Sequence, residues 1–543
     1  MPNLLRSKSS YCTVRTFDGG VIVLDCNISR AYSQSNKGGP NHYEASVLST
    51  VRPMAPFALH DVCTKLDIPC TVINYVDRWD QEELIDLLSQ WCDFQGLDNV
   101  MIACSAQFTS DQIVANPAFR DVILALKSKY NITLVIGGPV ASAKSDAFND
   151  LKPDVVFQGR SLHLFEDYLK GKISEQYIED INGVMSCKNH ITGVVREQPL
   201  VPTLYDDYCL NEKDIVQFEI RLGCKFNCTF CNFEFRGAKK VHDTETATLN
   251  KMFTDAQRKY NVTRFAAADD TVNEEESKVD LLVSATKTLS YRPKIVGFMR
   301  FDVMMAHPHT AEKLDRAGFI GPYFGIETFH PVAGKHIRKK VNRERGLNFL
   351  EFLTTQYPHW WVNSGYIIGL PGEPLKHNWS VLKEIKKRKL LDGIIPAALS
   401  IWQISGWTEN ESEMVTNPKK FGLTLTDKLE EDHEHPGLHF IHWHHEHSDY
   451  PTAVMYRNKA APMLAKGGVT LLSPWEVLMR DAIGGPDLFN VEEKNAFKKM
   501  ASEEHQGSFS RGADINDLAI LFYKEYIIRK KEYYQKLFAG EIK

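Results

Sequence analysis

Short apolar runs alternate with amphipathic stretches along the first third of the chain. Runs of this kind, bounded by turn residues, are typical of buried strands, and the stretches between them have helical spacing. The alternation predicts a parallel, doubly wound α/β sheet of Rossmann type, which binds ligands at the carboxyl ends of its strands. The predicted elements are strands at 21–25, 70–75, 100–105, 133–138 and 154–159, and helices at about 55–66, 81–92 and 118–130.

Later apolar runs, between about residues 214 and 400, end in carboxylates, an arginine or glycines. Each run reads as a buried strand that opens into a loop at its carboxyl end. The strings are Phe265-Ala-Ala-Ala-Asp269-Asp270-Thr271, Ile295-Val-Gly-Phe-Met-Arg300-Phe-Asp302, Gly321-Pro-Tyr-Phe-Gly-Ile-Glu327 and Gly365-Tyr-Ile367-Ile-Gly369-Leu-Pro-Gly-Glu373. For the first of these strings a helix cap is the alternative interpretation, because Asp and Thr favour caps.

The composition is that of a soluble globular protein of several domains. Of the 543 residues, 43% are hydrophobic and 24% charged, and the net charge of −5 gives no global basic field for duplex nucleic acid or an anionic membrane. No apolar run is long enough to span a membrane, and the N-terminus lacks the apolar core of a signal peptide. Eleven cysteines in so long a chain do not indicate a disulfide scaffold, so a reducing, cytoplasmic location is expected.

Cys224, Cys228 and Cys231 form the most informative motif, a Cys-x3-Cys-x2-Cys spacing. Three thiolates so close together suit three irons of a [4Fe–4S] cluster, whose fourth iron then has no protein ligand. A zinc site is the alternative, but zinc takes four ligands, often in paired motifs, and no second pair follows. Three buried free cysteines are the remaining possibility, since Cys often behaves as a small hydrophobe.

The cysteine motif and the strings after it, in this order, resemble the radical SAM (S-adenosylmethionine) superfamily over roughly residues 214–400. The resemblance implies a partial (β/α) TIM-type barrel in which SAM chelates the open iron. One electron, from a donor such as flavodoxin or ferredoxin, then splits SAM to a 5′-deoxyadenosyl radical. The residues implied to contact SAM are Phe230, Asp269, Asp270, Arg300, Glu327, Ile367 and Gly369. For Arg300 an ion pair with Asp302 is the alternative role, and for Phe230 simple packing.

The N-terminal region resembles the cobalamin (B12)-binding domain that precedes the barrel in one radical SAM class. A strand ending in Gly137-Gly138 and a later strand ending in Gln158-Gly159 carry this resemblance, and glycine lets a backbone approach a flat macrocycle closely. The implied cobalamin contacts are Ser105, Gly137, Gly138, Gln158 and Gly159. The chain departs from the pattern because it lacks Asp-x-His-x-x-Gly and continues with Arg160-Ser-Leu-His163 where acidic residues are usual. A domain that kept the fold and lost the cofactor is therefore the alternative.

These observations predict a cobalamin-binding-like domain at 1–175, a linker at 176–213, a radical SAM barrel at 214–405 and a mostly helical region at 406–543. The implied function is cobalamin-dependent methyl transfer to an unactivated carbon of a small molecule, nucleotide or peptide. The alternative is a rearrangement or oxidation that does not use methylcobalamin. Sulfur insertion would need a second cluster. The scattered cysteines of the N-terminal region, Cys63, Cys70, Cys92 and Cys104, lack a compact spacing for one.

Two features of the last 140 residues carry no complete motif. The stretch His433–His447 holds seven of the nineteen histidines, and a polar, aromatic loop is favoured over a metal site or a substrate-contacting loop. The segment Asp514–Phe538 has helical spacing and is expected to close a small helical domain.

Overall fold

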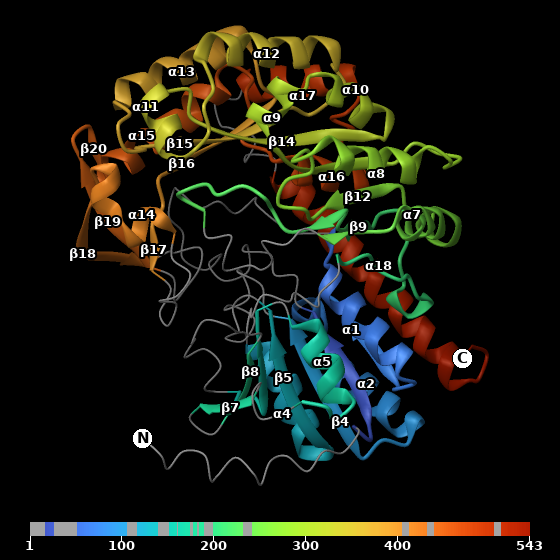
Figure 1. Ribbon diagram of the computed structural model, residues 1–543. Coiled ribbons are helices and arrows are strands. Elements are labelled where there is room, and N and C mark those ends of the chain that lie inside the picture. The colour runs from blue at the N-terminus through green and yellow to red at the C-terminus, as the bar shows by residue number, and fades with distance from the viewer. Residues whose placement is uncertain are drawn as a thin grey trace.

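Two seven-stranded sheets, one mostly and one entirely parallel, dominate the computed structural model (Figure 1). One belongs to the N-terminal third of the chain and the other to the middle. The structure describes residues 17–25, 51–105, 117–138, 151–159, 161–173, 178–181, 184–188, 199–231, 242–403, 412–431, 439–503 and 512–542.

The N-terminal sheet has the strand order β3-β1-β4-β5-β6-β8-β7 and confirms the predicted doubly wound fold. The order reverses between β1 and β4, and ligands bind such sheets at this switch point. Two strands, β8 and the antiparallel β7, extend the sheet past the predicted boundary at residue 175. The elements are β1 (Gly20–Leu24), β3 (Cys70–Ile73), β4 (Asn99–Ser105), β5 (Asn131–Gly137), β6 (Val155–Gln158), β7 (Ile178–Ile181) and β8 (Val184–Lys188), with helices α1 (Met54–Lys65), α2 (Gln81–Gln95), α4 (Pro117–Lys129) and α5 (Leu162–Leu169).

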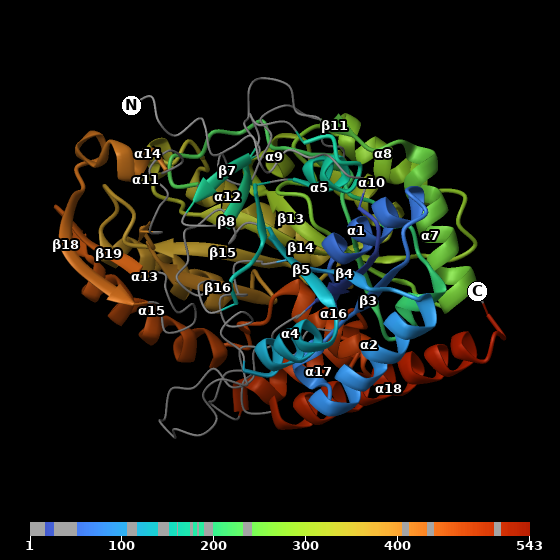
Figure 2. The same cartoon turned by 90° about the horizontal axis from the view of Figure 1, so that it is seen from below.

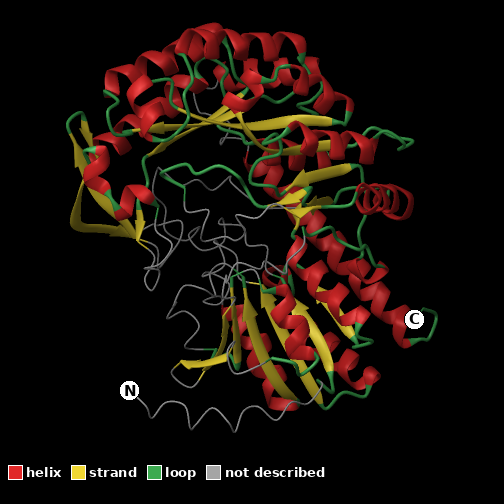
Figure 3. Ribbon diagram, viewed as in Figure 1, coloured by secondary structure: helices red, strands yellow, loops and turns green. Residues whose placement is uncertain are grey.

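The second sheet is an open, all-parallel partial barrel with the order β16-β15-β14-β13-β12-β9-β2. Its helices lie along its outer side (Figure 3). The strands are β2 (Val51–Arg52), β9 (Ile215–Phe218), β12 (Arg264–Ala267), β13 (Lys294–Arg300), β14 (Phe319–Glu327), β15 (Asn363–Ile368) and β16 (Gly393–Ala398), and the helices are α7 (Thr246–Tyr260), α8 (Glu276–Thr286), α9 (Phe301–Ala306), α10 (His309–Arg316), α11 (Pro331–His336), α12 (Arg343–Gln356) and α13 (Leu375–Arg388).

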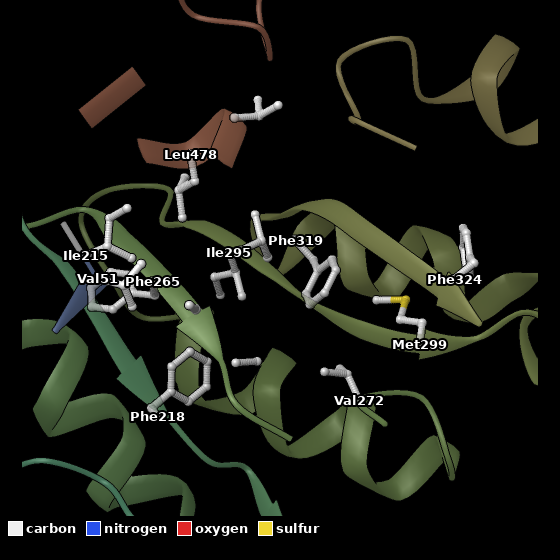
Figure 4. Packing of buried hydrophobic residues seen from close by; sticks show 14 of the residues in the cluster. Val51, Ile215, Phe218, Phe265, Val272, Ile295, Met299, Phe319, Phe324 and Leu478 are labelled. Atoms are coloured by element: carbon white, nitrogen blue, oxygen red, sulfur yellow. The ribbon is translucent and has the colours of Figure 1, made fainter. Parts of the chain in front are cut away.

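The strands of the barrel form because their apolar side chains are buried on both faces of the sheet. Phe218, Phe265 and Phe319 pack between strands and outer helices, while Leu478 of α16 (Pro474–Ala482) covers the sheet near Ile295 (Figure 4). Parallel strands buried on both faces are near-continuously apolar, as the sequence pattern indicated.

The edge strand β2 comes from a part of the chain that the sequence had placed in the first domain. Val51 and Arg52 pair in parallel with Ile215 and Val216 of β9. The chain therefore visits the barrel sheet between the first two strands of the N-terminal sheet.

The C-terminal region contains an antiparallel sheet that the sequence had not indicated, beside the expected helices. Its last helix, α18, runs back beside α2 of the N-terminal domain instead of closing a separate helical domain (Figure 2). None of the helices in the described segments has the length and apolarity that crossing a membrane requires. The elements are β17 (Trp402–Gln403), β18 (Thr424–Glu431), β19 (His439–His445), β20 (Ser448–Asp449), α14 (Glu413–Thr416), α15 (Tyr450–Ala465), α16, α17 (Val491–Glu503) and α18 (Gly512–Phe538).

Candidate functional site

The cysteine-bearing loop begins directly after β10 (Arg221–Leu222), and Asp269 fixes its entry. The buried Asp269 carboxylate accepts hydrogen bonds from the backbone N–H groups of Ile220 and Arg221, each at 2.9 Å. It also forms a buried ion pair with Lys278 at 2.7 Å. The carboxylate of Asp269, which was expected to contact SAM, therefore binds the backbone that leads into the loop. Its neighbour Asp270 is half-buried.

The far side of the loop is fixed by the segment that follows α11 and by α14. Arg338 donates to the carbonyl oxygen of Asn227 at 2.6 Å, and Thr229 donates to the carbonyl oxygen of His336 at 2.8 Å. The backbone N–H of Met414 donates to the carbonyl oxygen of Thr229 at 3.1 Å. Contacts on both sides of Cys228 therefore hold the loop in one position.

The three cysteines lie on this loop in different surroundings. Cys224 is half-buried with its Sγ 3.9 Å from the Thr271 hydroxyl, and burial raises the pKa of its thiol. Cys228 accepts a hydrogen bond from Arg300, and Cys231 is exposed. In the described part of the chain, no three His, Cys, Asp or Glu side chains gather around a point that would suit one metal ion. Three thiolates on one loop are a donor set that suits a [4Fe–4S] cluster with one iron left without a protein ligand, whereas a zinc site usually takes four protein ligands.

Arg300 ends β13 with its guanidinium turned to the loop. It forms a two-pronged ion pair with Asp302, with Nε–Oδ1 at 2.9 Å and Nη2–Oδ2 at 2.6 Å. Its Nη1 lies 3.1 Å from Sγ of Cys228. The ring of Phe226 covers the guanidinium at 4.0 Å. The structure thus contains the ion pair that the sequence offered as the alternative role, and adds a contact with a cluster cysteine.

Glu327 and Phe230, both predicted SAM contacts, are brought together by a lysine that sequence reasoning missed. Lys339 Nζ lies 2.9 Å from the Glu327 carboxylate and 5.5 Å from the centre of the Phe230 ring. A Cβ at Gly325 would lie 2.7 Å from Lys339 Nζ and 2.8 Å from Glu327 Oε1, so glycine leaves the space for this pair. Lys339 carries no local motif, and only the folded barrel identifies it.

The glycine-rich strand end is covered by β19, which contains His439, His442, His444 and His445 of the histidine tract, while His447 lies in the turn that follows. Gly369 has a φ of +88°, and a Cβ there would lie 2.5 Å from the Trp443 ring. The Gly369 carbonyl accepts a hydrogen bond from His445 Nε2 at 3.2 Å, and the Trp443 and His445 rings stack. Burial lowers the pKa of His445, so the ring is neutral near pH 7. His433 and His435 lie outside the described residues.

Next to Gly369, the partly buried Ile367 lies on β15 and packs against the barrel core. Glu373, which ends the glycine-rich string, is fully buried. Its carboxylate accepts hydrogen bonds from Thr328 Oγ1 at 2.7 Å and from His377 Nδ1 at 2.8 Å. Glu373 therefore ties the turn after β15 to the end of β14, a role that the sequence did not assign to it.

The predicted cobalamin residues meet at the carboxyl edge of the N-terminal sheet. Ser105 at the end of β4 pairs in register with Gly137 at the end of β5. Gly138 forms a bridge with Gly159, which directly follows Gln158 at the end of β6. Gly138 and Gly159 have φ angles of +101° and +73°, which favour glycine.

Comparison with known proteins agrees with this geometry. Residues 219–385 match the model of the radical SAM superfamily. One curated relative, tRNA-2-methylthio-N(6)-dimethylallyladenosine synthase of Ehrlichia canis (strain Jake), is 21% identical over 283 residues, which cover 49% of this chain and 60% of that protein. The match thus spans less than two thirds of the relative's length.

Two solved proteins share the fold along most of the chain. The radical SAM methyltransferase TsrM from Kitasatospora setae, with tryptophan and a SAM analogue bound, has a TM-score of 0.60 at 12% identity and covers 89% of this chain and 99% of its own. The cobalamin-dependent radical enzyme OxsB, with aqua-cobalamin and SAM bound, has a TM-score of 0.52 at 11% identity. The match covers 97% of this chain and 81% of the OxsB chain.

Residues 219–385 therefore form a radical SAM domain, and the partial barrel that they build has the fold expected of that superfamily. The architecture of the chain, with a doubly wound sheet before the barrel, is shared as a fold with TsrM and OxsB. A radical SAM domain implies a [4Fe–4S] cluster and SAM, and the donor set of the loop that carries Cys224, Cys228 and Cys231 fits such a cluster.

Proposed function

We propose that this radical SAM enzyme cleaves SAM reductively and, with cobalamin, transfers a methyl group to an unactivated carbon of its substrate. The observation that carries the proposal is the meeting of Ser105 with Gly137, Gly138 and Gly159 at one edge of the N-terminal sheet. Glycines with positive φ let a backbone approach a large flat ligand. TsrM and OxsB, whose structures hold cobalamin, share this two-sheet fold.

A contact between the two sheets supports a shared site. Asp25 and Asn74 directly follow β1 and β3, at the same carboxyl edge. The Asn74 amide donates to Asp25 at 2.8 Å and accepts a hydrogen bond from Arg52 of the barrel sheet at 2.6 Å. The edge that would hold cobalamin is thereby bound to the side of the barrel.

The residues of the barrel have separate tasks in this proposal. Cys224, Cys228 and Cys231 would hold the cluster, which supplies the electron that breaks the S–C5′ bond of SAM to leave methionine and an adenosyl carbon radical. Asp270 and Glu327 would bind and orient SAM. Strand β19 covers the glycine-rich turn and would keep water from that side of the site.

Sulfur insertion, the chemistry that the name of the tRNA-modifying relative indicates, is less well supported for this chain. A second cluster would need further clustered cysteines. In the segments that the structure describes, Cys92 and Cys104 are buried among apolar side chains. Methyl transfer needs no second cluster.

Anaerobic reconstitution of the full chain tests the proposal. The protein is loaded with iron and sulfide, incubated with hydroxocobalamin and SAM, and desalted, and its absorption spectrum is recorded. We expect bands of both the cluster and cobalamin, and 5′-deoxyadenosine after addition of a reductant. Cys228→Ala should remove the cluster band and SAM cleavage, whereas Cys92→Ala, a buried cysteine of α2, should keep both.

A pair of glycine variants tests the cobalamin edge. Gly138→Val should lose the cobalamin band, because a branched side chain is strained at this φ and blocks close approach. Gly96→Val is the matched control, since Gly96 also has a positive φ, of +65°, in the same domain but faces open space. A wild-type protein that retains no cobalamin yet forms 5′-deoxyadenosine would favour a rearrangement or oxidation instead.

A further inference from the structure

The side chain of Arg300 is fixed from three directions. Asp302 accepts two of its hydrogen bonds, at 2.9 Å and 2.6 Å, and the ring of Phe226 lies 4.0 Å from the guanidinium carbon. The remaining nitrogen, Nη1, points to Sγ of Cys228 at 3.1 Å. Arg300 is buried, with 5% of its surface exposed, so solvent screens these contacts little.

We propose that Arg300 and Asp302 form a charge pair that sets the reduction potential of the cluster through the sulfur of Cys228. This inference rests on the proposed function, because it requires the cluster. Arg300 acts here as a positioning and tuning residue, a role that differs from the SAM-carboxylate contact implied by the resemblance.

The sign of each contribution follows from charge. Reduction adds one electron to the cluster and its thiolate ligands, so a nearby cation and a hydrogen bond to sulfur stabilise the reduced state more than the oxidised state. Arg300 therefore raises the potential. Asp302 is an anion that partly cancels this effect, and it also holds the guanidinium in place. Removing the cation and removing the anion must shift the potential in opposite directions.

The test is an EPR-monitored redox titration of the reconstituted full chain without SAM or substrate. Arg300→Met should lower the midpoint potential, and Asp302→Asn should raise it. We expect about a tenfold change in the reduction equilibrium constant in each case, which is about 59 mV for a one-electron couple. Asp280→Asn is the control, because it removes the same charge from an exposed position on α8 and should leave the midpoint unchanged.

A purely structural role for the pair would not produce shifts of opposite sign. Iron content and circular dichroism are compared for all variants, and if Arg300→Met does not hold the cluster, Asp302→Asn and Arg300→Lys decide the sign. Cluster-loaded variants whose midpoint potentials are unchanged, or are shifted in the same direction, would overturn this inference and leave the proposed function standing. A wild-type chain that forms no [4Fe–4S] cluster would overturn the proposed function as well.

Discussion

At the scale of single residues, the sequence identified many of the side chains at the candidate site. It did not identify the residues that they contact. The cysteine motif and the charged strand ends could be recognised because each is a short local pattern. Their partners are distant in the chain, since Cys228 and Arg300 are 72 positions apart. Lys339, which joins Glu327 to Phe230, stands in no motif, so only the folded barrel could assign it.

Asp269 and Asp270 are neighbours in the sequence, but the fold gives the two carboxylates different surroundings. Asp269→Ala should destabilise the barrel by about 3–5 kcal/mol, because a buried ion pair is broken and two backbone N–H groups lose their acceptor. The variant should also bind less iron after reconstitution, since the entry to the cysteine loop is no longer held. Denaturant unfolding and iron analysis are the measurements.

The neighbouring Asp270→Ala provides the matched comparison. Asp270 is half-buried, so its loss should change the unfolding midpoint little and instead weaken SAM binding, measured by calorimetry on the loaded protein. Equal losses of stability in the two variants would contradict the separate roles of these adjacent carboxylates.

At the scale of helices and strands, regular apolar patterns were sufficient to predict most strands of the N-terminal sheet and of the barrel sheet. They did not predict the C-terminal sheet. Strand β19 is rich in histidine and lacks the alternation of apolar and polar residues that identifies a strand. Its conformation depends on antiparallel pairing with β18 and on Trp443, which donates to the Leu399 carbonyl at 2.8 Å. Such long-range pairing leaves little trace in the local sequence.

Helix α17 is attached to the barrel by a buried carboxylate, which gives a prediction for pH dependence. Asp392 contacts Lys498 at 2.8 Å and Lys494 at 3.5 Å. Burial alone would raise the pKa of Asp392, but the two lysines and the Val362 N–H outweigh it and hold this pKa below its usual value. A carboxyl with a lowered folded-state pKa stabilises the protein above its unfolded pKa of about 3.9, and the contribution is lost as the pH falls through the folded pKa.

Asp392→Asn should therefore be less stable than the wild type at pH 7, and the difference should narrow as the pH falls below about 4. Apparent unfolding temperatures measured between pH 7 and pH 3 test this. Asp427→Asn, at an exposed position of β18, should follow the wild type throughout. A difference that stays constant over this range would show that Asp392 stabilises by some other means than its charge.

At the scale of the whole molecule, the two sheets are tied together by segments that the predicted domain boundaries separate. The two-residue strand β2 lies in the N-terminal third yet extends the barrel sheet. Helix α18 returns from the C-terminus to the N-terminal sheet, where Tyr526 accepts a hydrogen bond from the Asn74 N–H at 3.0 Å. A strand of two residues has no periodicity, and an amphipathic helix does not specify its partner, so the sequence could predict neither connection.

The connection centres on Arg52, which is fully buried. Its guanidinium forms an ion pair with Asp214 at 2.6 Å, donates to Asn74, and lies over the Tyr526 ring at 4.5 Å. One side chain therefore touches the barrel sheet, the carboxyl edge of the N-terminal sheet and the last helix. The two sheets should accordingly lose their structure together when this contact is broken.

Arg52→Met should destabilise the protein by about 3–5 kcal/mol, because Asp214 is left as an unpaired buried charge. The loss should appear in both sheets at once, as faster hydrogen–deuterium exchange in β3 and β9. The double variant Arg52→Met with Asp214→Leu should recover much of the stability, since replacing a buried ion pair by apolar side chains is often neutral. A double variant that is stable but exchanges rapidly at the sheet edge around Asn74 would separate the two functions of Arg52, charge compensation within the barrel and attachment of the cobalamin-type domain.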